Sequence, residues 1–88
     1  MFTILIAEDD TDILELLTLY LENNSYKIIL AKNGLEAWEI FKQNKIDLIL
    51  VDIVMPEMNG YELIKKIRSE SEVPIIVMSA KNQDSDRI

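Results

Sequence analysis

The stretch that decides the fold is Asp47-Leu48-Ile49-Leu50-Val51-Asp52-Ile53-Val54-Met55-Pro56-Glu57-Met58-Asn59-Gly60. Its four consecutive apolar residues, Leu48 to Val51, predict a strand that is buried on both faces of a parallel sheet. Asp52 ends this run, directly before a loop that contains Pro56 and Gly60. Ligands of open parallel sheets bind beyond the carboxyl ends of the strands. Asp52 is therefore the first candidate for a chemical role.

The rest of the chain alternates between apolar runs and helical patterns. Further strands are expected at Phe2–Ala7, Tyr26–Ala31 and Pro74–Ser79. Helices are expected at about Asp12–Asn23, from Gly34 onward and at Gly60–Ser69, and Asp84–Ile88 resembles the opening of another. This alternation is typical of βαβ units with right-handed crossovers. We expect one α/β domain over residues 1–88, built on a doubly wound parallel sheet with helices on both faces.

Composition and charge exclude several classes of function. The 88 residues include no Cys and no His, which excludes disulfides, thiolate metal sites and histidine-ligated zinc. A net charge of −7 repels phosphate backbones, so we expect no direct binding of nucleic acid. No apolar run approaches the roughly 18 residues that span a bilayer, and Met1–Ala7 lacks the basic leader of a signal peptide. We expect a cytoplasmic protein that does not enter membranes.

Acidic residues end two of the predicted strands. Glu8 and Asp9 follow the first strand, and Asp52 ends the third. In a doubly wound sheet these strands can be neighbours, which would bring the carboxylates within a few ångströms. Because such charges repel, the arrangement favours a hard divalent cation, and Mg²⁺ suits a site with few protein ligands. The alternatives are helix capping for Asp10 and Asp12, and a solvated structural role for Asp52.

Other candidates have plainer interpretations. Ser79 ends the fourth strand, where its hydroxyl could contact a phosphoryl oxygen near Asp52 or simply begin a turn. Pairs of residues three apart predict helix caps, namely Asp12 with Glu15, Asn33 with Glu36 and Asn59 with Glu62. Side chains expected to pack in the core are Trp38, Phe41, Met55, Met58 and Met78.

The first helix carries more apolar surface than one core contact needs. Its apolar residues cover an arc of roughly 220°, against the roughly 100° of a usual core-facing stripe. They are Ile13, Leu14, Leu16, Leu17, Leu19, Tyr20 and Leu21. Either this helix packs on more than one side, or part of the excess contacts a partner.

Taken together, three stretches resemble the receiver domain of two-component response regulators. They are Ile4–Asp10, Asp47–Gly60 and Pro74–Ala80. The residues of these motifs are most similar to those of regulators that carry a winged-helix DNA-binding domain. The resemblance implies a flavodoxin-like fold with strand order 2-1-3-4 that lacks the last strand and helix of the family. It also implies a regulatory rather than enzymatic module.

The resemblance assigns a role to each candidate. Asp52 would accept a phosphoryl group from a phosphohistidine on a sensor histidine kinase. Asp9 and Asp52 would be direct Mg²⁺ ligands together with the backbone carbonyl of Val54, while Glu8 would act through water. Ser79 would be the switch hydroxyl. The kinase would dock on the first helix, at Ile13 and Leu14 especially.

Departures from the family pattern lead to further expectations. The lysine and the aromatic residue that the family carries on its fifth strand are absent, so we expect impaired switching. An uncovered fourth strand, Ile75 to Met78, would favour self-association of the chain.

Two alternative functions stay open. One is a non-phosphorylatable interaction fragment, and the other is a small Mg²⁺-dependent aspartyl phosphotransferase or phosphatase. The second usually needs an acid two residues after its nucleophile, where this chain has Val54.

Overall fold

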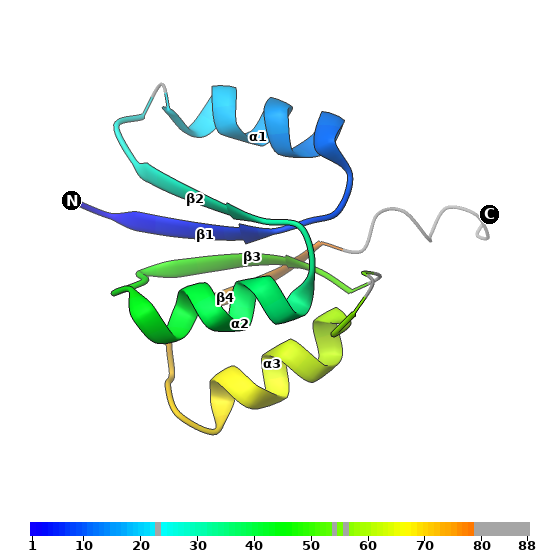
Figure 1. Cartoon of the computed structure of the whole chain (residues 1–88). Coiled ribbons are helices and arrows are strands. Elements are labelled where there is room, and N and C mark those ends of the chain that lie inside the picture. The colour runs from blue at the N-terminus through cyan, green and yellow to red at the C-terminus, as the bar shows by residue number, and fades with distance from the viewer. Residues whose placement is uncertain (23, 54, 56, 79–88) are drawn as a thin grey trace, which may run out of the picture.

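The computed structural model describes residues 1–22, 24–53, 55 and 57–78. Two candidate site residues, Val54 and Ser79, therefore lie outside the described residues, as does the helix opening expected at 84–88. The elements follow one another as β1 (Thr3–Ala7), α1 (Thr11–Glu22), β2 (Lys27–Ala31), α2 (Gly34–Gln43), β3 (Leu48–Asp52), α3 (Gly60–Arg68) and β4 (Ile75–Met78) (Figure 1).

The four strands form one parallel sheet in the order β2-β1-β3-β4. β1 pairs with β2 on one side and with β3 on the other, and β4 pairs only with β3 among the described strands. This confirms the predicted flavodoxin-like topology with strand order 2-1-3-4. After β1 the chain adds β2 on one side of this strand, and it then adds β3 and β4 on the other side. The topological switch point therefore lies between β1 and β3, and sheets of this kind bind ligands at that point.

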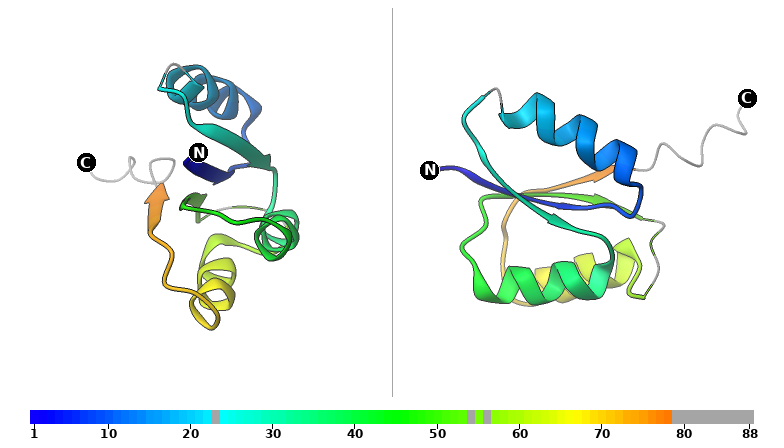
Figure 2. Two further views of the ribbon diagram at one scale, coloured as in Figure 1. Left: turned by 90° about the vertical axis from the view of Figure 1, so that its left-hand side faces the viewer. Right: turned by 45° about the horizontal axis from the view of Figure 1, so that its top comes forward.

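Helices cover both faces of the sheet, as the buried strands require. α1 lies on one face, and α2 and α3 lie on the other (Figure 2). Alternate residues of β1 face opposite sides, so Leu5 and Ala7 pack toward α2 and α3, whereas Ile4 and Ile6 pack toward α1. All five residues of β1 are buried, and full burial of each large apolar side chain stabilises the fold by about 1.5–3 kcal/mol.

The predicted packing residues lie in or against this core. Trp38 and Met55 are buried, and Phe41, Met58 and Met78 are half-buried against core clusters. Trp38 and Phe41 stack with their ring centroids 5.9 Å apart. A role in packing therefore accounts for all five.

The caps of α2 and α3 agree with the sequence, but the cap of α1 differs. Asn59 and Glu62 form a complete capping box at α3. The predicted Asp12–Glu15 cap of α1 was wrong, whereas the alternative of Asp10 as a helix cap is confirmed. Its cap is Asp10, whose Oδ1 accepts hydrogen bonds from the backbone N–H groups of Asp12 at 2.9 Å and Ile13 at 3.4 Å. The reason is that the helix begins at Thr11, so Asp12 already lies in the first turn, where an acid favours the helix dipole.

At α2, Asn33 Oδ1 accepts from the backbone N–H of Glu36 at 2.7 Å, as predicted. The Glu36 side chain does not complete a capping box with Asn33. Its Oε1 accepts instead from the backbone N–H of Lys32 at 2.7 Å. This bond ties the last turn before α2 to the helix itself.

The apolar arc of α1 divides between core and surface. Leu14 is only 3% exposed and packs against Ile4 and Ile6, so its assignment to a docking surface was wrong. Spacing explains this, because Leu14, Leu17 and Leu21 recur every three to four residues and share the face that meets the sheet. The exposed part consists of Leu16, Leu19 and Tyr20, each at least 66% exposed. Among the described residues no helix is long and apolar enough to cross a bilayer.

Two glycines permit close contacts of the helix starts with the loop after β3. A Cβ at Gly34, the first residue of α2, would lie 1.8 Å from the carbonyl oxygen of Met58. A Cβ at Gly60, the first residue of α3, would lie 2.6 Å from the carbonyl oxygen of Asp52. The obstructing atoms are backbone atoms, so a larger residue at either position must displace the loop.

We predict that Gly34→Ala lowers the free energy of unfolding by about 2 kcal/mol, because overpacking forces the backbone of Met58 to move. Helix propensity alone predicts the opposite sign, since alanine favours a helix over glycine by up to about 1 kcal/mol. Urea unfolding measures the difference. Gln43→Ala, at the exposed end of the same helix, is the control and should change stability by less than about 0.5 kcal/mol. A stabilised Gly34→Ala variant would contradict the packing described here.

Candidate metal centre

The site lies where the two central strands end. β1 and β3 pair in parallel with Ala7 opposite Val51. The residues after this pair, Glu8 and Asp9 beyond β1 and Asp52 at the end of β3, therefore emerge at the same edge of the sheet. No local interaction along the chain produces this proximity, because it depends on the neighbouring positions of β1 and β3.

Three carboxylates meet at this edge. One carboxylate oxygen from each of Glu8, Asp9 and Asp52 lies within 4.8 Å of the others. Glu8 and Asp52 are 2% and 1% exposed, whereas Asp9 is exposed. The cluster thus has a buried floor and an accessible side, which is the arrangement that a small ligand arriving from solvent requires.

Hydrogen bonds hold Glu8 in place from two directions. Its backbone N–H donates to the carbonyl of Ala31 at 3.0 Å, which continues the pairing of β1 with β2. Its side-chain Oε2 accepts from the backbone N–H of Asp10 at 3.0 Å. Because Asp10 also caps α1, the start of α1 and the floor of the cluster share one hydrogen-bonded turn.

The loop after β3 is held close to Asp52. The backbone N–H of Gly60 donates to the carbonyl of Ile53 at 2.8 Å, so the start of α3 returns to the end of β3. Met55 within this loop is 7% exposed and packs in the larger core cluster. The packing of Gly60 against the backbone of Asp52 leaves little room for this strand end to shift.

The electrostatics of the cluster favour a cation. Two carboxylates 4.8 Å apart repel by about 3.5 kcal/mol at an effective dielectric constant near 20, and three carboxylates form three such pairs. A divalent ion reverses the sign of this energy. Carboxylate oxygens are hard ligands of the kind that Mg²⁺ and Ca²⁺ take, and Mg²⁺ tolerates a site in which water supplies part of the shell. The donor set therefore fits Mg²⁺.

The predicted site residues fall into three groups in the structure. Glu8, Asp9 and Asp52 come together at the sheet edge. Asp10 and Asp12 belong to the start of α1. Val54 and Ser79 lie outside the described residues, so their predicted roles stay predictions.

Sequence reasoning missed how the cluster is positioned. The Glu8 carboxylate accepts a hydrogen bond from a backbone N–H only two residues further along, and no specific signal in the sequence predicts it. The contacts of Gly34 and Gly60 connect separate parts of the chain. In the sequence, the sole signal for them is a glycine at the first position of a helix.

Comparisons with known proteins agree with this architecture. Residues 4–88 match the family model described as the response regulator receiver domain. The response regulator GtcR of Aneurinibacillus migulanus is 50% identical over 86 residues, which are 98% of this chain and 36% of that protein. The transcriptional regulatory protein SrrA of Staphylococcus aureus is 40% identical over 85 residues, 97% of this chain and 35% of that protein.

Solved structures show the same fold. The response regulator TrrA of Thermotoga maritima, determined in complex with Mg²⁺-BeF, superposes with a TM-score of 0.85 at 37% identity, covering 91% of this chain and 70% of that one. The chain spans about a third of the length of the curated relatives it matches. From its parallel sheet, its strand order and the match over residues 4–88, this chain belongs to the response regulator receiver domain family.

Proposed function

We propose that this domain accepts a phosphoryl group on the Asp52 carboxylate in a two-component phosphorelay. The observation that supports the proposal is the cluster of Glu8, Asp9 and Asp52 within 4.8 Å at the switch point of the sheet. TrrA was determined with Mg²⁺-BeF, which indicates that a relative with this fold holds a metal together with a phosphoryl-like group. Asp52 is the buried carboxylate at the end of β3 in this chain, and we propose it as the acceptor.

In this proposal each carboxylate has a separate task. An oxygen of Asp52 forms a bond to phosphorus as the P–N bond of a phosphohistidine breaks, and the leaving imidazole keeps the electron pair and takes up a proton. Asp9 and Asp52 would ligate Mg²⁺ directly, and Glu8 would do so through water. The ion would neutralise charge on the transferring group. Val54, through its carbonyl, and Ser79, as the switch hydroxyl, complete the proposed set.

The proposed phosphoryl donor is a sensor histidine kinase in the cytoplasm. The structure changes the residues expected to meet it. Ile13 is half-buried and Leu14 is buried, whereas Leu16, Leu19 and Tyr20 expose apolar surface on α1. We propose docking on these three side chains beside Ile13. SrrA is named a transcriptional regulatory protein, which supports an output in transcription for the protein to which this domain belongs.

The enzymatic alternative uses the same nucleophile but needs a second acid to hydrolyse its acyl phosphate. A signalling module instead keeps the phosphoryl group long enough for it to be read. The two functions therefore differ after the first transfer, because one leaves a stable modified protein and the other turns over continuously.

We predict that incubation with acetyl phosphate and Mg²⁺ adds one phosphoryl group to the wild-type chain, as seen by intact mass. Asp52→Asn removes the nucleophile and should show no addition. Asp9→Asn weakens the metal site and should slow the addition at least about tenfold, because charge neutralisation at the transferring group is lost.

Asp12→Asn is the matched control, since it removes an acid of the same kind one turn away without touching the cluster. It should be phosphorylated like the wild type. Equal addition to wild type and Asp52→Asn would refute the assignment of the acceptor. No addition to either would favour a purely interacting fragment, and continuous release of phosphate from small phosphoesters would favour the enzyme.

We also predict that Asp52→Asn is more stable than wild type in the presence of EDTA, by about 2 kcal/mol, because one repelling charge is gone. Added Mg²⁺ should stabilise the wild type and close this gap, while the variant should respond little. Thermal unfolding with and without Mg²⁺ measures both effects. Asp12→Asn should respond to Mg²⁺ as the wild type does, and an identical Mg²⁺ response in Asp52→Asn would count against a metal site that includes Asp52.

Self-association through β4 is a second proposal. Among the described strands β4 pairs on one side only, and Ile76 and Val77 are 52% and 45% exposed. An apolar strand edge of this kind can pair with the same edge of another chain. Such pairing would extend the sheet across two molecules.

We predict that Val77→Lys weakens this association about tenfold while the domain stays folded, because a charged side chain on an edge opposes strand pairing. Sedimentation equilibrium over a concentration series measures the change, and circular dichroism verifies folding. Leu16→Lys, which places the same charge on α1, should leave strand pairing intact. A wild-type chain that is folded and monomeric at every concentration would overturn this proposal.

A further inference from the structure

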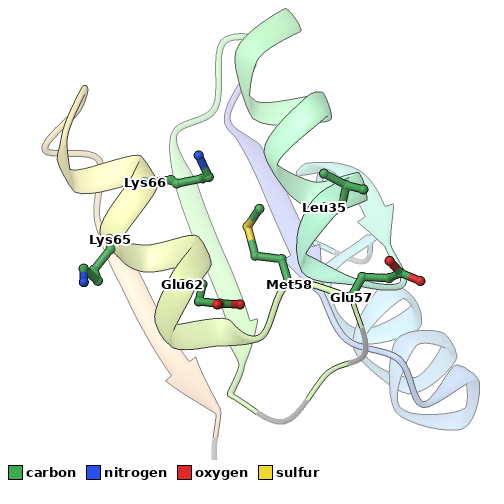
Figure 3. Close-up of a pocket in the computed structure, with 6 residues that line it drawn as sticks. All are labelled: Leu35, Glu57, Met58, Glu62, Lys65 and Lys66. Carbon is green, nitrogen blue, oxygen red and sulfur yellow. The ribbon is translucent and has the colours of Figure 1, made fainter.

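A groove lies between α2 and α3, on the sheet face opposite α1. It has a volume of about 440 Å³ and is lined by Leu35 of α2, by Glu57 and Met58 of the loop after β3, and by Glu62, Lys65 and Lys66 of α3. Figure 3 shows Met58 between the two helices, with Leu35 on one side and the α3 side chains on the other. No role in the proposed phosphoryl transfer uses these side chains.

The floor of the groove is apolar. Leu35 is 45% exposed, and Met58 is half-buried against the core cluster that contains Trp38. Thioether side chains adapt to the shape of whatever packs on them. A partner that covered this strip would remove exposed apolar surface from water at little steric cost.

Charges along the groove are ordered from acid to base. Glu57 lies in the loop before α3 and Glu62 in its first turn, and Lys65 and Lys66 lie about one turn further along α3 than Glu62 (Figure 3). Because α2 and α3 both return antiparallel to the strands, the last turn of α2 brings Lys42 to the basic end as well. The Nζ atoms of Lys42 and Lys66 each lie 5.3 Å from the centre of the Trp38 ring.

Part of this charge is available to a partner. Glu62 completes the cap of α3, and Lys66 lies over Trp38. Glu57 and Lys65 are both exposed and, within the part of the chain that the structure describes, neither forms an ion pair with the other or with a neighbour. They are the charges best placed to form ion pairs with a second molecule.

We propose that the groove binds a second copy of this chain across a two-fold axis. The two-fold axis lies in the contact plane and runs perpendicular to the groove, so the two grooves face each other in antiparallel directions. The acidic end of each groove then lies opposite the basic end of the other. Glu57 of one copy then lies opposite Lys65 of its partner, and the converse pair forms at the same time. A second copy whose groove ran in the same direction would place the acidic end of one groove opposite the acidic end of the other. Charge complementarity therefore selects one orientation.

The contact is weak, because two chains of net charge −7 repel one another. Many of these acids lie elsewhere, at the carboxyl ends of β1 and β3 and on α1, and ions of physiological strength screen such charges beyond about 8 Å. The proposal depends on the groove alone and holds whether or not Asp52 is phosphorylated.

The test uses charge reversal in chains that carry Val77→Lys, so that pairing of β4 edges does not contribute. In this background Glu57→Lys and Lys65→Glu should each weaken self-association about tenfold or more in sedimentation equilibrium. An equimolar mixture of the two variants should associate as strongly as the unreversed chain. In the mixed dimer both cross-groove pairs join opposite charges again.

Controls of equal charge change lie away from the groove. Glu22→Lys at the end of α1 and Lys27→Glu at the start of β2 should leave the association unchanged, and their mixture should gain nothing. The proposal is overturned if the unreversed chain stays monomeric at high concentration, if the mixture of groove variants does not recover, or if the control variants behave like the groove variants. Circular dichroism of each variant verifies that the domain is folded.

Discussion

The structure depends on the parallel pairing of β1 with β3. This pairing brings carboxylates that are more than forty residues apart to the same sheet edge, within 4.8 Å. Left uncompensated, their repulsion opposes the fold at the place where its two central strands end. Burial of the two strands offsets this cost. β1 is buried along its whole length and β3 at Ile49, Val51 and Asp52, and apolar burial of Ile4, Leu5 and Ile6 alone stabilises the fold by several kcal/mol. The proposed function rests on the same arrangement, because a divalent cation would offset this repulsion.

The surroundings of the cluster restrict how its members can move apart. Glu8 is fixed by bonds to Ala31 and Asp10, and the end of β3 is fixed by Gly60. Carboxylates on flexible loops would separate and remain solvated. Held in place, they present oxygen ligands that a divalent ion would bind without first having to order them. Preorganisation of this kind is what distinguishes a metal site from an acidic surface.

Much of the fold could be predicted from the sequence, because its signals are local and repeat. Local patterns mark strands and helix starts, as the apolar runs Phe2–Ala7 and Leu48–Val51 and the caps Asn33 and Asn59 do. The errors at α1 show the limit. Choosing between Asp10 and Asp12 as the cap of α1 requires the position of the helix start to within one residue, and a run of consecutive acids does not define it. The sequence suggests a docking role for Leu14 because periodicity defines an apolar arc on the helix. It does not show which part of that arc packs on the sheet. The contacts of Gly34 and Gly60 depend on tertiary approach, which no local pattern encodes.

Acidic and basic side chains gather at opposite ends of the strand axis, and this distribution affects both helix stability and the proposed function. Acids gather at the carboxyl ends of the strands and in the first turns of the helices, while Lys42, Lys65, Lys66 and Arg68 lie in the last turns of α2 and α3. Each placement favours its helix dipole. A consequence is a strongly negative rim around Asp52, which attracts cations and repels a phosphoryl donor. An acceptor in such a field needs a bound cation before an anionic donor can approach. Under the proposed function, the charge pattern that stabilises these short helices would therefore also make transfer to Asp52 dependent on the metal.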